Sequence, residues 1–511
     1  MLGDRMLGHA VALLLCLGTT TSALPQSPIR DAPLRRAEPY RLLAAAGLGS
    51  QLFFQGDDEY ATTLQSYYSG ESREITPQCI LKPETAKQVS VAIETLNSDK
   101  AGRCWNVAIR AGGHSNFVAS NTASGVTIDL VKLNTLEVNE DGTVSVGTGN
   151  RWGDVYRYLE PRGLMVAGGR ENTVGVGGLL LGGGFSWFSG NVGFAADNVA
   201  AYEVVLANGS IIAATASDNA DLFRALKGGA CNFGLVTTFV LRSFPARDLF
   251  GGVMVFSYAQ ADAVMRAFVD MIDGNTDGRP NDTGFASAAW DRLGGRRMAF
   301  IAANLEGRAN TTAFAGLEPI VDLRAKLPVT GIAAQIADGT DGEHQVWTTL
   351  TYANTVDMGR KVLASFEALV GDMEAEFDAE DEDGDVRIIY LISPFPTLFS
   401  SHGGDGNVMG LAESHTRNAV VFSLQALLPT ARYRNLLRRK VDEATTGIEV
   451  YAKETGQDVR YRYLNYAGPG QNPLARYGEE NVRFMKEVAA RYDPGEFFQF
   501  GVPGGFKLKD V

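Results

Sequence analysis

Between residues 72 and 115 the spacing of apolar positions predicts a strand, a helix and a second strand. The run QCILKP is short and ends at a proline, and ETAKQVSVAIETLNS, which begins near Thr85, carries apolar residues at helical spacing. The run NVAIRAGG then leads into two adjacent glycines. Alternation and 3.6-residue spacing are the primary signals of strands and helices.

The next segments predict a further strand and two hairpins. GVTIDL is a compact apolar run, and LEVNEDGTVSVGTG and VVLANGSIIAAT place Asp-Gly and Asn-Gly between β-branched residues. Such dipeptides are the strongest short-range hairpin signal. RWGDVYRYLEPRG, between the two hairpins, has the spacing of a helix.

From Phe250 to about Thr455 the pattern changes to aliphatic strands alternating with long amphipathic helices. Examples of these helices are YAQADAVMRAFVDMIDG and MGRKVLASFEALVGDMEAEF. Glycine clusters thin out here and return, with aromatic residues, from Tyr461. We therefore place a domain boundary near Arg247 and expect three segments, at residues 72–247, 248–455 and 456–511.

Length and charge narrow the class of protein. A chain of 511 residues is too long for one core. Its formal net charge of −13 disfavours binding to a phosphate backbone, so no nucleic-acid partner is expected. After the N-terminus no run of 18 apolar residues occurs, and no membrane span is expected.

The N-terminus, residues 1–23, resembles an export signal. Arg5 is followed by the apolar run VALLLCLG and by small residues at Thr21–Ala23 that suit cleavage. The alternative is a signal anchor that stays attached. The prediction is a secreted protein, in the extracellular space or the lumen of the secretory pathway.

Export would place the cysteines in an oxidising compartment. Cys79 and Cys104 each lie beside a strand-like run, and we expect them to form a disulfide. Cys231 would then remain as a buried free thiol. Three glycosylation triplets agree with export but are common by chance; they begin at Asn208, Asn281 and Asn310.

Two glycine-rich motifs could carry chemistry. IRAGGHSNFVASN places His114, one of only five histidines, after Gly112-Gly113, and GGRENTVGVGGLLLGGGFSWFSGN holds eight glycines between Gly168 and Gly184. Glycine lets the backbone approach a ligand closely and lets its N–H groups hold phosphates. The pattern G-x-G-x-x-G is absent because its last position is Leu180. A large anionic ligand is predicted, although His114 taken alone fits an ordinary surface turn equally well.

Other catalytic classes have less support. His402 and His415 lie thirteen residues apart without matching carboxylates, so we expect a loop and no metal site. No G-x-S-x-G hydrolase motif occurs.

Four motifs in order resemble one family. IRAGGHSNFVASNTASGVTIDL, TVGVGGLLLGGGFSWFSGNVGFAADNV, KGGACNFGLVTTF and the C-terminal region from YLNYAGPGQNP to FGVPGGFKL are similar to the FAD-linked oxidoreductases of the vanillyl-alcohol oxidase superfamily. The similarity is greatest to the berberine-bridge-enzyme-like branch and its secreted fungal members, and it covers about residues 60–511.

The resemblance implies an α+β fold of the PCMH type. Residues 72–247 would bind FAD, residues 248–455 would form a central α/β substrate domain, and residues 456–511 would return to the FAD domain.

The resemblance also implies covalent attachment of His114 to the 8α-methyl of the flavin. Glu171 stands where bicovalent members carry a cysteine, so a single attachment is expected, and Cys231 lies in another motif and would not replace that cysteine. Val174 would be an oxygen gatekeeper of the kind that favours an oxidase. The expected cofactor contacts are His114, Arg110, Gly112, Gly113, Ser115, Val174, Gly175, Gly177, Gly178, Asn232, Val236 and Asn465.

In YRYLNYAG, which the resemblance places on a strand facing the flavin, Tyr463 and Tyr466 are the candidate catalytic phenols. A phenol has a pKa near 10 and needs a cationic or hydrogen-bonded setting to act as a base. Arg460 and Arg462 would lie on the opposite side of that strand from Tyr463. Packing is the alternative role for both tyrosines.

The predicted function is that of a secreted FAD-dependent oxidase. It would pass a hydride from a substrate C–H to the flavin and release hydrogen peroxide from O2. The small-molecule substrate would be an aromatic, alkaloid or polyketide metabolite or a carbohydrate. The alternatives are a cyclase or isomerase without net oxidation, and a non-catalytic binding protein.

Overall fold

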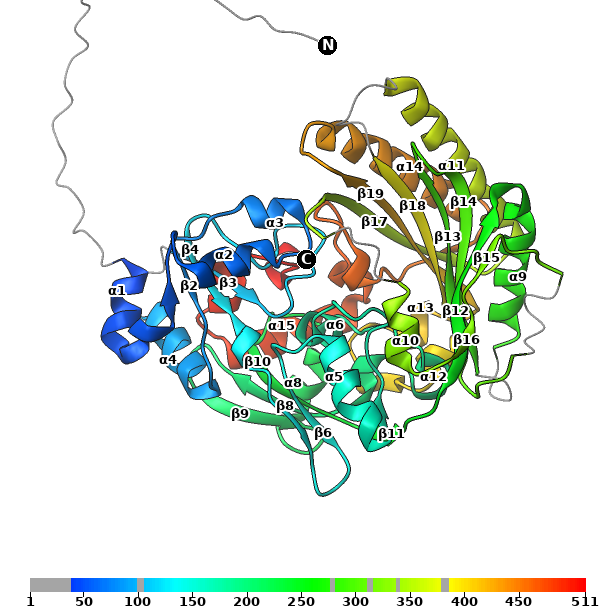
Figure 1. The fold of residues 1–511 in the computed structure, drawn as a ribbon. Helices are drawn as coiled ribbons and strands as arrows, with labels where there is room; N and C mark the ends of the chain where they lie inside the picture. The colour runs from blue at the N-terminus through cyan, green and yellow to red at the C-terminus, as the bar shows by residue number, and fades with distance from the viewer. Residues whose placement is uncertain (1–37, 99–104, 276–280, 310–315, 337–340, 378–385) are drawn as a thin grey trace, which may run out of the picture. The chain divides into compact units, whose positions relative to one another are not determined.

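The structure is a computed structural model that describes residues 38–98, 105–275, 281–309, 316–336, 341–377 and 386–511 (Figure 1). The predicted signal segment, Cys104 and Asn310 lie outside the described residues. Cys79 is a buried thiol, and its predicted bridge to Cys104 stays a prediction.

The predicted strand–helix–strand unit is present in a first, four-stranded sheet. Thr85 caps α4 (Ala86–Leu96) by accepting a hydrogen bond from the Gln88 N–H, and α4 packs on the sheet through apolar residues such as Val89 and Ile93. The strand order is β1 (Leu52–Phe53), β2 (Cys79–Leu81), β4 (Gly125–Asp129) and β3 (Asn106–Arg110). β2 and β3 both run parallel to β4.

Both predicted hairpins belong to a second, antiparallel sheet. Its strand order is β5 (Leu136–Val138), β6 (Val144–Gly147), β10 (Leu235–Leu241), β8 (Val199–Val205) and β9 (Ile211–Thr215). The predicted helix between the hairpins is α5 (Trp152–Leu159). A small ribbon pairs β7 (Leu164–Val166) with β11 (Ser243–Pro245).

The third sheet is large, and all its pairings are antiparallel. Three long helices cover one of its faces (Figure 1): α9 (Ala261–Asp273), α11 (Val356–Glu376) and α14 (Arg434–Glu454). Its strand order is β15 (Val321–Asp322), β12 (Leu249–Ser257), β14 (Gly295–Asn304), β13 (Asp282–Asp291), β18 (Arg387–Phe395), β19 (Ala419–Leu428), β17 (His344–Ala353) and β20 (Asp458–Val459), with β16 (Ala325–Leu327) also paired to β12.

The two faces of this sheet have different neighbours. In β19 the side chains of Val420, Phe422 and Leu424 enter the apolar core beneath the helices, whereas Ser423 and Gln425 alternate with them. Side chains of a strand point to opposite faces in turn. Gln425 therefore lies on the face without the three helices, where it lines a pocket.

Among the described residues, no helix is long and apolar enough to cross a membrane.

Further helices connect these layers. The other helices are α1 (Pro39–Leu43), α2 (Asp58–Gln65), α3 (Gly70–Glu74), α6 (Val176–Leu181), α7 (Ser189–Val192), α8 (Ala220–Leu226), α10 (Val329–Ala334), α12 (Thr397–Ser401), α13 (Leu411–Ser414) and α15 (Glu479–Tyr492).

Candidate active site

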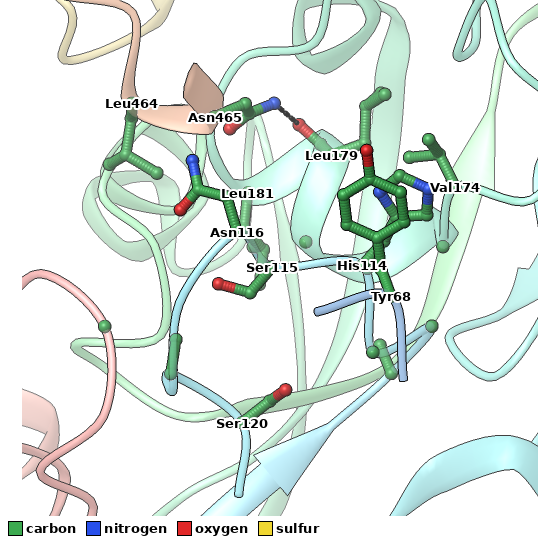
Figure 2. A pocket seen from close by; sticks show the side chains of 18 of the residues that line it. Tyr68, His114, Ser115, Asn116, Ser120, Val174, Leu179, Leu181, Leu464 and Asn465 are labelled. Atoms are coloured by element: carbon green, nitrogen blue, oxygen red, sulfur yellow. Dashed lines mark hydrogen bonds between the residues drawn. The ribbon is translucent and has the colours of Figure 1, made fainter. Parts of the chain in front are cut away.

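A cavity of about 550 Å³ brings the two glycine motifs, the large sheet and the C-terminal segment together (Figure 2). This volume is within the usual range of small-molecule and cofactor sites. Most of the predicted cofactor contacts line it: Gly112, Gly113, His114, Ser115, Val174, Gly175, Gly177, Gly178, Val236 and Asn465. Tyr463 and Tyr466 line it as well.

One wall of the cavity is made of backbone. Gly112 and Gly175, from the two separate motifs, touch so closely that a Cβ on Gly112 would lie 2.4 Å from the Cα of Gly175. Gly113 has a φ of +67°, in the region that favours glycine. A Cβ on Gly178 would meet nothing within 4 Å. Where Gly112 crosses Gly175, which we call the glycine crossing, any side chain would clash with backbone, so glycine is required there. At Gly178 a side chain would enter open space.

His114 lies in the cavity lining with its ring fixed from two directions. Figure 2 shows the Tyr68 ring over the imidazole; the two centroids are 4.1 Å apart and the planes differ by 12°. His114 Nε2 lies 3.2 Å from Thr173 Oγ1 and 3.6 Å from the Glu171 carboxylate.

Several buried polar atoms of the lining have no partner within the described part of the chain. They are Asn116 Oδ1, Ser120 Oγ and Asn465 Oδ1. The Asn465 amide N–H₂ is held by the Leu179 carbonyl at 3.1 Å (Figure 2), which fixes its side chain. A buried polar atom without a partner costs free energy, so these three atoms suit a polar ligand that satisfies them.

The expected strand around Tyr463 and Tyr466 is wrong. β20 ends at Val459, and Leu464–Tyr466 is a 3₁₀ turn in which the Tyr466 N–H donates to the Tyr463 carbonyl. β20 is the edge strand and pairs with β17 only through Asp458 and Val459, after which the chain leaves the sheet. The alternation argument for Arg460 and Arg462 therefore does not apply.

Arg170 places a positive charge beside the Tyr466 phenol, and the sequence pattern did not single this residue out. Arg170 donates from Nη2 to the Tyr466 hydroxyl oxygen at 2.8 Å and to Ser393 Oγ at 3.2 Å. Its guanidinium also lies 4.4 Å from the Phe285 ring centroid. Arg170 directly precedes Glu171 in the second glycine motif, and that position was the only signal that could have found it.

Tyr463 has a different environment from Tyr466. It is fully buried, and its hydroxyl accepts hydrogen bonds from the Phe185 N–H at 2.9 Å and from the Asn465 amide at 3.1 Å. Burial, together with the neighbouring Tyr466, raises the Tyr463 pKa well above its usual range.

Two predicted cofactor contacts are not in the lining. The Arg110 guanidinium is buried and pairs with Asp129 at 2.8 Å. Asn232 donates to the carbonyls of Gly229 and Phe506. Both side chains therefore hold neighbouring backbone and side chains in place.

Cys231 differs from expectation, because it is half-buried and lines the same cavity as His114. The large sheet contributes further lining that carried no motif: Phe285, Trp347, Leu391 and Gln425. These residues sit on strands whose pattern predicted secondary structure but not which face would meet a ligand.

The two loop histidines have protein partners. His415 accepts at Nδ1 from Ser400, donates from Nε2 to the Phe395 carbonyl, and has its pKa lowered to about 4 by burial. His402 contacts the Gly190 carbonyl. Within the described ranges no group of three metal-ligating side chains occurs.

Residues 77–215 match the family model described as an FAD binding domain. The chain is also 33% identical over 477 residues to the FAD-dependent monooxygenase drtC of Aspergillus calidoustus, covering 92% of this chain and 90% of that protein. The chain belongs to the berberine-bridge-enzyme-like family of FAD-linked oxidoreductases. A second relative, the FAD-dependent monooxygenase tpcD of Cochliobolus heterostrophus, is 33% identical over 467 residues, with 86% and 87% covered.

Solved structures share the fold of this chain. Berberine bridge enzyme from Eschscholzia californica superposes with a TM-score of 0.69 at 16% identity, over 90% of this chain and 97% of that one. Glucooligosaccharide oxidase from Acremonium strictum superposes with a TM-score of 0.70 at 17% identity, over 90% and 97%. The α+β, PCMH-type fold expected from the motifs is therefore confirmed.

The cavity of this family member fits FAD. Glycines from both motifs line the cavity, and beside Gly178 there is open space in which a flat or phosphate-bearing group could approach the backbone closely. Asn116, Ser120 and Asn465 offer polar atoms without protein partners in the described ranges. The protein is an FAD-dependent oxidoreductase.

Proposed function

We propose that the protein is an oxidase of small organic substrates in which Tyr466 is the catalytic base. The observation that carries this proposal is the 2.8 Å contact from Arg170 to the Tyr466 hydroxyl, in the same cavity as His114. Residues 72–247 and 456–511 would hold the cofactor, and residues 248–455 would form the substrate wall.

Bound FAD supplies the acceptor for a substrate hydride. The Tyr466 oxygen would take the proton from a substrate hydroxyl, phenol or amine while the hydride leaves the adjacent carbon. The Arg170 guanidinium donates a hydrogen bond to the Tyr466 oxygen and would hold it in a fixed position beside the substrate. Tyr463 is the weaker candidate because burial opposes its ionisation.

The walls of the cavity favour a substrate with a planar apolar body. Phe285 and Trp347 present aromatic rings, Leu391 an aliphatic surface and Gln425 an amide that can orient a polar group. An aromatic or polyketide-type secondary metabolite fits this lining, and a carbohydrate stacked on Trp347 is the other substrate class to test. Two relatives are named FAD-dependent monooxygenases.

We further propose a single covalent attachment through His114. The glucooligosaccharide oxidase of Acremonium strictum carries a 6-S-cysteinyl, 8α-N1-histidyl FAD. Here the second attachment position holds Glu171, which cannot form a thioether. We also propose that residues 1–23 direct export of the protein and that O2 reaches the flavin beside Val174.

Anaerobic mixing with candidate substrates tests the reaction. A substrate should bleach the flavin absorbance, and admission of air should restore it with one hydrogen peroxide per product. Bleaching in Tyr466→Phe should be at least about 100-fold slower. Turnover without any bleaching would contradict the oxidase and support a cyclase or isomerase.

A monooxygenase is the second candidate because the relatives carry that name. Turnover under ¹⁸O₂ separates the two activities. An oxidase leaves the label in hydrogen peroxide, whereas a monooxygenase places one labelled atom in the product.

A further inference from the structure

Glu171, Thr173 and His114 form a connected chain of side chains at the edge of the cavity. Thr173 Oγ1 donates to Glu171 Oε2 at 2.7 Å and lies 3.2 Å from His114 Nε2. The Glu171 carboxylate also accepts from the backbone N–H groups of Thr173 at 2.9 Å and Val174 at 3.0 Å. Glu171 is therefore held in a fixed position by its own loop.

This chain determines which nitrogen of His114 carries the proton. A threonine hydroxyl has one hydrogen, and here it points to the carboxylate. The Thr173 oxygen can then only accept from His114, so Nε2 is the protonated nitrogen. In the neutral imidazole the lone pair is consequently on Nδ1.

The ring is also fixed in its plane. Tyr68 stacks on one face of the imidazole with a 12° angle between the planes (Figure 2). The loop that carries Thr173 is itself fixed, because the Arg151 guanidinium donates to the carbonyls of Thr173 and Gly112. Arg151 thus connects the His114 motif to the Glu171 motif.

We propose that Glu171 and Thr173 are positioning residues that prepare His114 for covalent attachment of FAD through Nδ1, and that Glu171 receives the proton released in that step. This inference rests on the attachment in the proposed function. It gives Glu171 a role of its own, beyond occupying a position where other members have cysteine.

Attachment removes two protons and two electrons from the reacting pair. The 8α-methyl of the flavin loses a proton, a bond forms between Nδ1 and the 8α carbon, and the Nε2–H bond breaks. The Nε2 proton passes to Thr173 Oγ1 while the Thr173 hydrogen passes to Glu171. The electron pair of the broken methyl C–H bond would stay in the isoalloxazine, and O2 would remove it together with two protons as hydrogen peroxide.

The test is the rate at which apoprotein converts added FAD into acid-stable flavin, measured by flavin fluorescence of the denatured chain. Glu171→Gln and Thr173→Val should attach FAD about 10- to 100-fold more slowly than the wild type. Thr173→Ser keeps the hydroxyl and should attach FAD within about threefold of the wild-type rate. The dissociation constant for FAD before attachment, measured in parallel, should stay within about threefold in all variants if they fold.

A second readout does not depend on attachment. ¹⁵N NMR of the histidine side chains in the apoprotein, with His114→Ala to assign the signal, reports which ring nitrogen of His114 carries the proton. The proposal expects the Nε2–H form in the wild type and its loss in Thr173→Val.

The outcomes separate the two proposals. Wild-type attachment with unchanged rates in Glu171→Gln and Thr173→Val, or an Nδ1–H imidazole in the wild type, overturns the positioning role alone. A wild type that holds FAD without any acid-stable flavin overturns the attachment and the positioning role together.

Discussion

The two walls of the cavity are built in different ways. The cofactor wall is made of backbone, with Gly112 and Gly175 in direct contact and His114 beside them. The opposite wall is made of side chains, such as Phe285 and Gln425, on strands of the large sheet. The first wall depends on glycine at fixed positions, whereas the second can change with single side chains.

The difference follows from what each wall must do. Backbone N–H groups bind any phosphate-bearing or flat ligand, and only glycine allows the close crossing. Strand side chains alternate, so Leu391 of β18 and Gln425 of β19 line the cavity, whereas their neighbours Ile392 and Leu424 pack in the core beneath the helices α9, α11 and α14. Substrate specificity can therefore vary without loss of the core.

Tyr466→Phe should have the largest effect, because it removes the proposed base and leaves the ring packing in place. The expected loss is about 10²- to 10⁴-fold in kcat with little change in KM. Tyr463→Phe is the matched control and should lower kcat by less than about tenfold. Equal losses in both variants would contradict the assignment of the base to Tyr466.

Gly112→Ala tests the backbone wall. Its Cβ would overlap the Gly175 Cα, so we expect the free energy of unfolding to fall by roughly 3 kcal/mol and flavin content to drop. Gly371→Ala is the control, because Gly371 lies within α11, outside the cavity lining, and a Cβ there would meet nothing within 4 Å. Urea unfolding of the two variants should differ in midpoint, and equal midpoints would show that the crossing is not tight.

The free energy of unfolding should fall in acid, because a buried histidine packs against the large sheet that forms the substrate wall. His415 stacks on Phe395 at the end of β18, and burial lowers its pKa to about 4. The unfolded chain binds this proton below about pH 6.5 and the folded chain only near pH 4, so the contribution of His415 to stability is constant above pH 6.5 and falls as the pH decreases from 6.5 to 4. The loss from this residue is up to about 3 kcal/mol. His415→Gln cannot titrate and should show a shallower fall in unfolding free energy over the same window.

Gln425→Leu should have the smallest effect and act on specificity alone. It removes an amide from the cavity face of β19 and leaves the helix-facing residues unchanged. We expect kcat/KM to change by about 10- to 100-fold for substrates that hydrogen-bond there and by less than about threefold for others. Flavin content should not change, and uniform losses across substrates would contradict a specificity role.

The sequence predicted the cofactor wall better than the substrate wall. α4 after Thr85, the two hairpins and the helices α9 and α11 followed from periodicity and turn chemistry. His114 and the glycines followed from two short motifs, although the contact between Gly112 and Gly175 that requires glycine is formed only by the fold. Arg170 was missed because its partner Tyr466 lies 296 residues later, and only the fold brings the two together. The strand expected at Tyr463 was wrong, because the chain leaves β17 after Val459 and forms a 3₁₀ turn at Leu464–Tyr466.

Peptide mapping of the native flavoprotein by mass spectrometry tests the attachment through His114 most directly. Cys231 and His114 both line the cavity, so the attachment site must be identified and not assumed. We expect one flavin on the peptide that contains His114, none on the peptide that contains Cys231, and no attached flavin in His114→Ala. Flavin on Cys231, or FAD fully released from the wild-type chain by acid, would contradict a single attachment through His114.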